Sequence, residues 1–363
     1  MAEARLYRIL GGPGSPYSLK MRAVMRYRRL PYTWTVPTGF PGQADELLAA
    51  GKGIIPVIQS PEGEYWADST PMILELERRY PGTRSLLPRN PADRFLARLI
   101  EDFADEWMVL ILFDYRWAAE IDQKFCSRRQ LASWLGAMPG AEFDSIVDQF
   151  TDRQTQLLAK MGDREINRPL LQATYGDTLQ AMEEQQDASR FLFGSRPSIA
   201  DFGVYAQLSQ TAIDPSPSAI MRRDAVRTFQ WVHDMDDLSG IEGAWRNPTA
   251  EPLGPGVLKL LKLIGEVYLP FMAANAKAVR AGDATTTAEL RGMPMVARAN
   301  RYKMRCLTTL KLALRDALAE GAEDLEELLT QYGCWNALQL LPGELDDFAP
   351  LSHIDTEPQS GPF

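Results

Sequence analysis

The side chain best placed for chemistry is the hydroxyl of Ser15, which follows the glycine-rich segment Gly11–Gly14. A short strand-like apolar run precedes this segment and a helical apolar pattern follows it, so Ser15 is expected at the first turn of a helix. The unpaired N–H groups and the dipole at a helix start favour negative charge. A hydroxyl there can donate a hydrogen bond to a thiolate and lower the pKa of a bound thiol. Ser15 is therefore our candidate catalytic residue, with simple N-capping as the structural alternative and Ser18 as a weaker second donor.

Two further pairs of residues have types suited to binding a peptide-like ligand. A cis bond at Ile55-Pro56 would present the backbone N–H and C=O of Ile55 to an extended peptide, whereas a trans proline would only mark an edge strand. Asp68-Ser69 precedes a helical pattern, so the Ser69 hydroxyl and the helix amides can bind a carboxylate and Asp68 can bind an ammonium group. Simple capping of the helix is the alternative for this second pair.

The composition argues against several other chemistries. The 48 acidic and 39 basic residues give a net charge of -9, which disfavours binding to nucleic acid backbones. Only two histidines occur, and the three cysteines, Cys126, Cys306 and Cys334, have no C-x-x-C spacing, so we expect no metal and no histidine-dependent triad. No run of about 18 apolar residues and no signal-peptide pattern is found. We therefore expect a cytoplasmic protein with no nucleic acid and no membrane partner.

The N-terminal quarter of the chain alternates between strand and helix signals. Runs of β-branched and aromatic residues predict strands, and periodic apolar positions predict helices. The predicted strands are residues 6–10, 32–36, 54–58 and 65–67, and the predicted helices are residues 19–30, residues 45–50 and a segment opened by Asp68. This order predicts a small α/β domain over residues 1–88.

Strand signals disappear after residue 90. Helical patterns occupy residues 92–119, 127–135, 143–161, 170–189 and 200–211. They predict an all-helical domain over residues 90–245, and proline and glycine breakers follow it up to residue 256. Three more helical patterns, at 257–281, 286–320 and 325–341, predict a helical extension over residues 256–345, and residues 346–363 form a polar tail.

This organisation resembles the glutathione transferase superfamily, and three short motifs carry the resemblance. Ser15-Pro16-Tyr17-Ser18-Leu19-Lys20 is similar to the family's Cys/Ser-Pro-x-x-x-Arg/Lys segment, Ile55-Pro56 stands at the place of its cis-proline, and Asp68-Ser69 is similar to its Glu/Asp-Ser pair. Ser198-Ile199-Ala200-Asp201 also resembles the capping box of the family's helical domain. The resemblance covers about residues 4–245 and leaves the extension unexplained.

The resemblance implies an α/β thioredoxin-like N-terminal domain, an all-α C-terminal domain of the glutathione transferase type, and glutathione as cosubstrate. Ser15 would then stabilise the glutathione thiolate, which fits thiolate activation better than disulfide exchange. Ile55 and Pro56 would pair with the peptide backbone, and Asp68 and Ser69 would bind the γ-glutamyl end. Many members hold the glycyl carboxylate with a Gln or Lys where this chain has Ile54, so we expect Lys52, the nearest cation, to serve there.

A second substrate needs its own pocket, and the resemblance places it beside the first helix of the helical domain. We expect Tyr17, Trp107, Met108 and Tyr115 to face a small apolar electrophile, with ordinary core packing as the alternative for the last three.

The predicted function is therefore a glutathione transferase-like enzyme that conjugates glutathione to an apolar electrophile or displaces a group from it. A glutathione-dependent lyase or isomerase would use the same thiol site. The alternative is a non-catalytic binding or assembly protein that uses the apolar face between Val257 and Tyr268 as its interface. A homodimer is expected from the resemblance. A third possibility is that the extension covers the cleft through Tyr332, Cys334 and Trp335.

Overall fold

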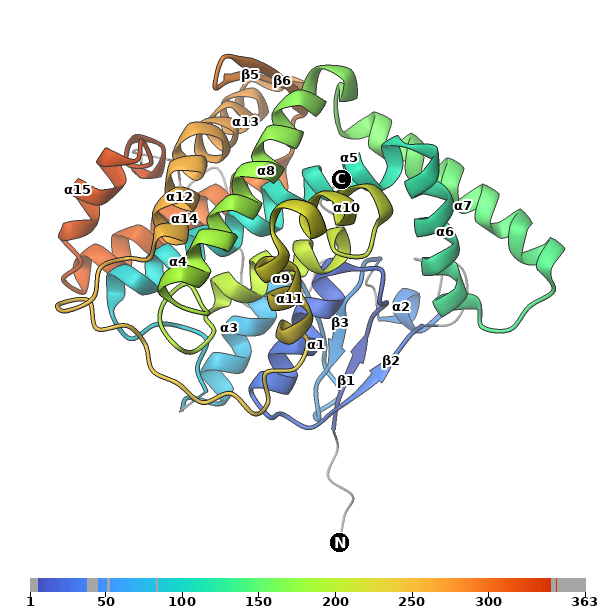
Figure 1. The fold of residues 1–363 in the computed structure, drawn as a ribbon, viewed down its shortest axis with the longest axis horizontal. Helices are drawn as coiled ribbons and strands as arrows, with labels where there is room; N and C mark the ends of the chain where they lie inside the picture. The colour runs from blue at the N-terminus through green and yellow to red at the C-terminus, as the bar shows by residue number, and fades with distance from the viewer. Residues whose placement is uncertain (1–5, 38–44, 51–52, 83, 341–343, 345–363) are drawn as a thin grey trace, which may run out of the picture.

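The N-terminal part of the computed structural model is a four-stranded sheet with helices packed on it (Figure 1). The structure describes residues 6–37, 45–50, 53–82, 84–340 and 344. The strands are β1 (Tyr7–Leu10), β2 (Tyr32–Thr35), β3 (Val57–Gln59) and β4 (Tyr65–Ala67), and they lie in the order β2-β1-β3-β4. The helices of this part are α1 (Pro16–Tyr27), α2 (Asp45–Ala49) and α3 (Ser69–Arg79). This is the predicted thioredoxin-like order of elements.

The sheet is mixed, as the short connections require. The β1 and β2 strands are parallel because α1 connects them, while β3 pairs antiparallel with both β1 and β4. Ile9 and Ile58 face each other across the β1–β3 pair and are fully buried. The α1 helix begins where the sequence predicts, with Ser15 as N-cap and Pro16 at the first helical position.

The second part is all helical, as predicted. Its elements are α4 (Pro91–Phe103), the π-helical turn η1 (Ala104–Met108), α5 (Val109–Ala118), α6 (Glu120–Leu135), α7 (Gly140–Met161), α8 (Arg164–Ala188), α9 (Ile199–Thr211), α10 (Pro215–Asp224) and α11 (Val226–Met235). The α9 helix is buried along its whole length, and the predicted capping box starts it, because the Asp201 carboxylate accepts hydrogen bonds from the backbone N–H and the hydroxyl of Ser198. The π-helical turn η1 was not predicted.

The extension contains a β-hairpin, which the sequence analysis missed. Its elements are α12 (Pro255–Leu263), the π-helical turn η2 (Ile264–Tyr268), α13 (Leu269–Ala281), β5 (Thr285–Leu290), β6 (Met293–Arg298), α14 (Arg301–Ala319), α15 (Asp324–Gln331) and the short 3-10 turn η3 (Asn336–Leu338). The prediction of a helix over 286–320 is therefore wrong for its first third. Consecutive β-branched threonines at the start of β5 favour a strand, and Arg291 and Gly292, both at positive φ, make the two-residue turn that antiparallel strands prefer.

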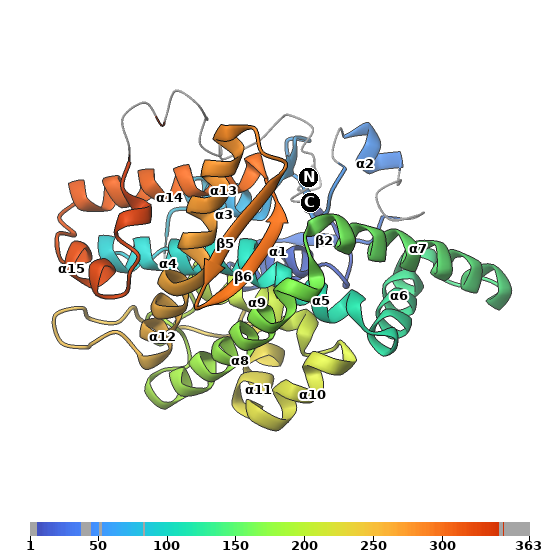
Figure 2. The ribbon, with the colours of Figure 1, turned by 90° about the horizontal axis from the view of Figure 1, so that it is seen from above.

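The extension packs on its own chain. Its helices lie along the helical domain, α12 against α8 and α14 against α4, while the hairpin lies beside α8 and α13 (Figures 1 and 2). Val257, Leu260, Leu261 and Ile264 are fully buried. The apolar face that suggested an assembly interface is thus covered within the molecule, and the non-catalytic alternative loses the feature that favoured it.

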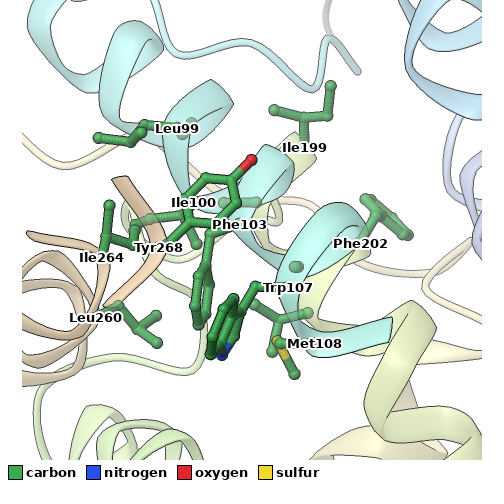
Figure 3. Packing of buried hydrophobic residues seen from close by; sticks show 14 of the residues in the cluster. Leu99, Ile100, Phe103, Trp107, Met108, Ile199, Phe202, Leu260, Ile264 and Tyr268 are labelled. Carbon is green, nitrogen blue, oxygen red and sulfur yellow. The ribbon is translucent and has the colours of Figure 1, made fainter. Parts of the chain in front are cut away.

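One continuous core joins the extension to the helical domain. Figure 3 shows Phe103 from α4 and Trp107 from η1 beside Leu260 from α12 and Tyr268 from η2. The rings of Phe103 and Tyr268 meet edge to face, with centroids 5.7 Å apart. The position of the extension relative to α4 and η1 is therefore fixed by close packing.

The contact between η2 and the segment after α15 gives a test of this packing. A Cβ atom at Gly265 would lie 1.8 Å from the backbone oxygen of Tyr332, so Gly265→Ala forces these segments apart. We expect the free energy of unfolding to fall by about 1–3 kcal/mol, as for other overpacked cores. Gly176→Ala is the matched control, because Gly176 lies inside α8 with open space around it, and it should gain about 0.5–1 kcal/mol. Equal stabilities in urea denaturation would contradict the close packing at Gly265.

Candidate active site

A cavity of about 450 Å³ lies between the N-terminal domain and the helices α5, α6 and α7. All three parts of the chain contribute to its wall. The N-terminal domain provides Ser15, Tyr17, Ile55, Pro56, Asp68 and Ser69, the helical domain provides Asp105, Glu106, Val109, Leu112, Phe113, Trp117, Phe150 and Leu157 among others, and the extension provides Tyr302. The volume is in the range of pockets that hold small molecules.

Ser15 lies at the cavity wall and also caps α1. Its hydroxyl oxygen accepts a hydrogen bond of 3.2 Å from the backbone N–H of Ser18. This leaves the hydroxyl hydrogen available to a ligand atom, so the capping and the donor roles are compatible. The Ser18 side chain is different: it is fully buried, accepts from the backbone N–H of Gly12 at 3.3 Å, and is not part of the wall. The weaker candidacy of Ser18 is therefore wrong.

The segment around position 55 lies at the cavity wall. The Ile55-Pro56 bond is cis, as predicted, and Ile54, Ile55 and Pro56 all line the cavity. Lys52, the cation expected to hold a glycyl carboxylate, lies outside the described residues.

Asp68 and Ser69 line the cavity at the start of α3. Asp68 has φ 75°, which a non-glycine residue adopts only at a local energetic cost, and its side chain makes no capping hydrogen bond. Instead, its Oδ2 accepts a hydrogen bond of 2.6 Å from the hydroxyl of Tyr302. Burial raises the pKa of the Asp68 carboxyl to about 6, although the Tyr302 hydrogen bond acts in the opposite direction. Simple capping is thus the wrong explanation for Asp68.

Behind Ser69 lies a buried ion cluster that the sequence analysis missed. The Lys20 ammonium lies 2.6 Å from Glu101 Oε1 and 2.6 Å from Asp105 Oδ2, and it donates to the Ser69 hydroxyl at 3.2 Å. Burial acts to lower the pKa of Lys20, but the two carboxylates outweigh it and raise the pKa above its ordinary value. Burial raises the pKa of Asp105 to about 8 in spite of Lys20. The available signal was the group of acidic residues at 101, 102, 105 and 106 inside an otherwise apolar helix.

The π-helical turn η1 positions two of these acidic groups. Asp105 and Glu106 both lie in η1 and both line the cavity. The Tyr17 hydroxyl donates a 2.7 Å hydrogen bond to the backbone oxygen of Asp105, which ties α1 to this turn. Single π-helical turns of this kind are common at functional sites.

Of the four residues predicted for the second-substrate pocket, Tyr17 lines the cavity and the other three do not. Trp107, Met108 and Tyr115 are buried in the core and are not part of the wall. Trp107 donates to the Thr174 hydroxyl at 3.3 Å, and Tyr115 packs on Tyr175. The apolar wall is formed instead by Val109, Leu112, Phe113, Trp117, Phe150 and Leu157. The extra residue of a π-helical turn rotates the following helix by about 100°, because one α-helical residue turns the chain by that angle, so a regular helical pattern assigns the wrong face.

The three extension residues expected over the cleft also lie elsewhere. Cys334 is fully buried, with its sulfur 3.5 Å from the backbone oxygen of Leu261. Tyr332 and Trp335 pack on the main core and are not part of the cavity wall. The extension reaches the cavity through Tyr302 instead.

Among the described residues, no group of three or more His, Cys, Asp or Glu side chains is placed to hold a metal ion. Among the same residues, no helix is both long and apolar enough to span a membrane.

Comparison with known proteins gives one family match. Residues 10–84 match the glutathione S-transferase N-terminal domain. No curated protein sequence matches the chain.

Several solved structures are similar to this chain. The β-etherase LigF from Sphingobium sp. strain SYK-6 is 17% identical, with 71% of this chain and 99% of that chain covered and a TM-score of 0.45. The Tau class glutathione S-transferase MiGSTU from mango, Mangifera indica L., is 16% identical, with 70% and 93% covered and a TM-score of 0.41. A glutathione S-transferase from Methylobacillus flagellatus KT with glutathione bound is 18% identical, with 64% and 96% covered and a TM-score of 0.38.

Proposed function

We propose that this chain, a member of the glutathione transferase superfamily through its N-terminal domain, activates the thiol of glutathione and transfers the sulfur to a small apolar electrophile. The observation that carries the proposal is the Ser15 hydroxyl at the start of α1, on a cavity whose wall also includes Ile55, Asp68 and Ser69. These groups match the parts of glutathione one by one. A cytoplasmic location and a homodimer remain predictions.

The binding mode follows from the chemistry of each group. The backbone of Ile55 pairs with the peptide of glutathione, the Ser69 hydroxyl and the first amides of α3 bind the γ-glutamyl carboxylate, and Asp68 binds its ammonium group. This arrangement brings the cysteinyl sulfur to Ser15. A hydrogen bond from Ser15, together with the helix dipole, favours the thiolate over the thiol. A free thiol has a pKa of about 8.5, and lowering it by about two units requires about 2.7 kcal/mol.

The apolar half of the cavity supports the choice of a hydrophobic second substrate. Leu112, Phe113 and Trp117 from α5 line it together with Phe150 and Leu157 from α7, and the rings of Trp117 and Phe150 are in contact, with centroids 5.8 Å apart. Such a wall binds an apolar molecule by removing its surface from water and holds its electrophilic carbon near the thiolate. Conjugation, displacement, ether cleavage and isomerisation all begin from this arrangement.

The proposal is tested by direct binding of glutathione. The full chain should bind to immobilised glutathione, elute with free glutathione, and give a one-site isotherm in titration calorimetry. Ophthalmic acid, which keeps the γ-glutamyl and glycyl ends and replaces the thiol-bearing side chain, should bind without any thiolate absorbance. Absence of glutathione binding at millimolar concentration would refute the proposed function.

The apolar subsite can be tested separately with Leu157→Trp. Leu157 is half-buried at the cavity wall, so the larger ring fills space that the second substrate needs. We expect about a tenfold weaker binding of an apolar fluorescent dye and a matching rise in KM for the electrophile, with glutathione affinity unchanged. The control is Gln156→Trp, because Gln156 is exposed on the same helix and is not part of the wall. An equal effect of the two variants would show that the cavity is not the second-substrate site.

A further inference from the structure

Within the part of the extension that the structure describes, one side chain lines the cavity, the phenol of Tyr302 near the start of α14. Its hydroxyl donates the 2.6 Å hydrogen bond to Asp68 Oδ2, between residues that are 234 positions apart in the chain. No other hydrogen bond or ion pair to the Asp68 side chain occurs among the residues that the structure describes. The orientation of this carboxylate therefore depends on a residue outside the N-terminal domain, which binds glutathione in our proposal.

The start of α14 is held firmly, so Tyr302 has a defined position. Asn300 caps the helix by accepting from the backbone N–H of Tyr302 at 2.8 Å. Lys303 is buried and lies 2.6 Å from the Glu106 carboxylate, while it also donates to the Glu106 backbone oxygen at 2.8 Å. These bonds attach α14 directly to η1, and side chains from both elements line the cavity.

We infer that Tyr302 is a positioning residue for the γ-glutamyl subsite: its hydroxyl occupies Oδ2 of Asp68 and thereby presents Oδ1 to the ammonium group of glutathione. This inference rests on the proposed function. It gives the extension a specific role, because removal of the α14 contact would leave the γ-glutamyl carboxylate site at Ser69 intact and disorient only the ammonium site.

The charges around Asp68 make the inference measurable through pH. Burial is the main cause that raises its pKa to about 6, and the carboxylates of Glu106 and Glu101 act in the same direction. The hydrogen bond from Tyr302 and the charge of Lys20 act to lower it. Further charged or titratable groups on the packed elements are Tyr17 from α1, Asp105 from η1, and Lys303 and Cys306 from α14.

The direction of the effect follows from these contributions. The ammonium group binds the ionised carboxylate, so glutathione affinity is present above the pKa of Asp68 and is lost as the pH falls through it. Without the Tyr302 hydroxyl the pKa of Asp68 rises further, because the hydrogen bond that stabilises the ionised Asp68 carboxylate is lost. The loss of affinity in Tyr302→Phe must therefore begin at a higher pH than in the wild type.

The experiment is titration calorimetry of glutathione from pH 5 to pH 8 with wild type, Tyr302→Phe, Asp68→Asn and the double variant. We expect Tyr302→Phe to bind about tenfold more weakly at pH 7, since a hydrogen bond to a charged group is worth about that factor or more. Its acid limb, the fall of glutathione affinity with decreasing pH, should begin at a higher pH than in the wild type. Asp68→Asn should bind weakly with no acid limb, and the double variant should lose nothing more. In turnover, the KM for glutathione should rise in Tyr302→Phe while kcat changes little.

Tyr268→Phe is the matched control. The Tyr268 hydroxyl donates to the Asp102 carboxylate in the same buried region, but neither residue lines the main cavity. This variant loses an equivalent tyrosine–aspartate bond and should keep the wild-type affinity and acid limb.

The possible outcomes separate the two proposals. Wild-type affinity and an unmoved acid limb in Tyr302→Phe, beside weak binding by Asp68→Asn, would overturn the role of Tyr302 and leave the proposed function standing. Equal losses in Tyr302→Phe and Tyr268→Phe would also overturn it, because a general loosening of the extension would then explain both. A wild type that does not bind glutathione would remove the proposed function itself, and this inference with it.

Discussion

Ser15→Ala is expected to lower kcat/KM for the addition of glutathione to an apolar electrophile by about tenfold to a hundredfold near pH 6.5. The Ser15 oxygen already accepts from the Ser18 N–H, so its hydrogen is the group that can stabilise a thiolate. Alanine removes this donor, and the pKa of the bound thiol returns towards the free value of about 8.5. The bound glutathione is then mostly protonated below pH 8, and the rate falls with the concentration of the reactive anion.

The measurement follows the ultraviolet absorbance of the thiolate during a glutathione titration, alongside kcat/KM over a range of pH. The alanine variant should still bind glutathione, because the peptide and γ-glutamyl contacts remain, and should lose about 1 kcal/mol of stability with the N-cap. Ser15→Thr keeps both the hydroxyl and the cap and should retain most of the signal. An undiminished thiolate absorbance in Ser15→Ala would remove this residue from the mechanism.

Lys20→Met should destabilise the fold by about 3–5 kcal/mol, which is a large part of the stability of most domains. Lys20 is fully buried between Glu101 and Asp105, both of which are also buried. Methionine has a similar length and fills the space, but it leaves two carboxylates without the ammonium group that compensates them. The cost of the substitution is the burial of these unpaired charges.

The loss should also depend on pH, in a direction set by Asp105. The folded-state pKa of this group is raised to about 8, above its unfolded value of about 3.9, so the folded state holds the proton more strongly. Its ionisation therefore weakens the fold as the pH rises between these two values. Without Lys20 the carboxylates are even harder to ionise in place, so the difference between Lys20→Met and wild type should be larger at pH 8 than at pH 5.

Urea denaturation at the two pH values measures both effects. The matched control is Lys262→Met, which breaks the exposed pair of Lys262 and Glu266, 3.8 Å apart, and should change stability by less than about 1 kcal/mol. If Lys20→Met were as stable as Lys262→Met, the buried cluster would be no more than a surface-type ion pair in energetic terms.

The residues of the proposed glutathione subsite could largely be predicted from short stretches of the chain. Ser15, Ile55-Pro56 and Asp68-Ser69 all line the cavity, and each was found by the turn or cap in which it lies. Signals of this kind are local: a glycine-rich turn, an N-cap serine or a proline constrains the backbone of its immediate neighbours. The order of strands and helices in the first domain was predictable for the same reason.

The apolar part of the cavity wall, which we propose for the second substrate, could not be predicted in this way. The pattern from residue 92 to 119 identified a helix, but it gave no sign of the π-helical turn that moves Trp107 and Tyr115 into the core and brings Leu112 and Trp117 to the cavity. The hairpin β5–β6 was missed because the helical pattern of α14 was extended back through the turn at Gly292, although Met293 and Met295 have the spacing of a strand. Its pairing and its packing on α8 and α13 establish the hairpin.

The sequence by itself determined that Ser15 and Ser198 begin helices and that a cis-proline bond precedes β3, because these features depend on neighbours within a few positions. Only the tertiary structure decided that Lys20 lies between Glu101 and Asp105 and that Tyr302 bonds Asp68, since these partners are 81, 85 and 234 positions apart. Contacts over such separations depend on how whole helices pack, and packing is set by the combined burial of many side chains and not by the two residues that meet.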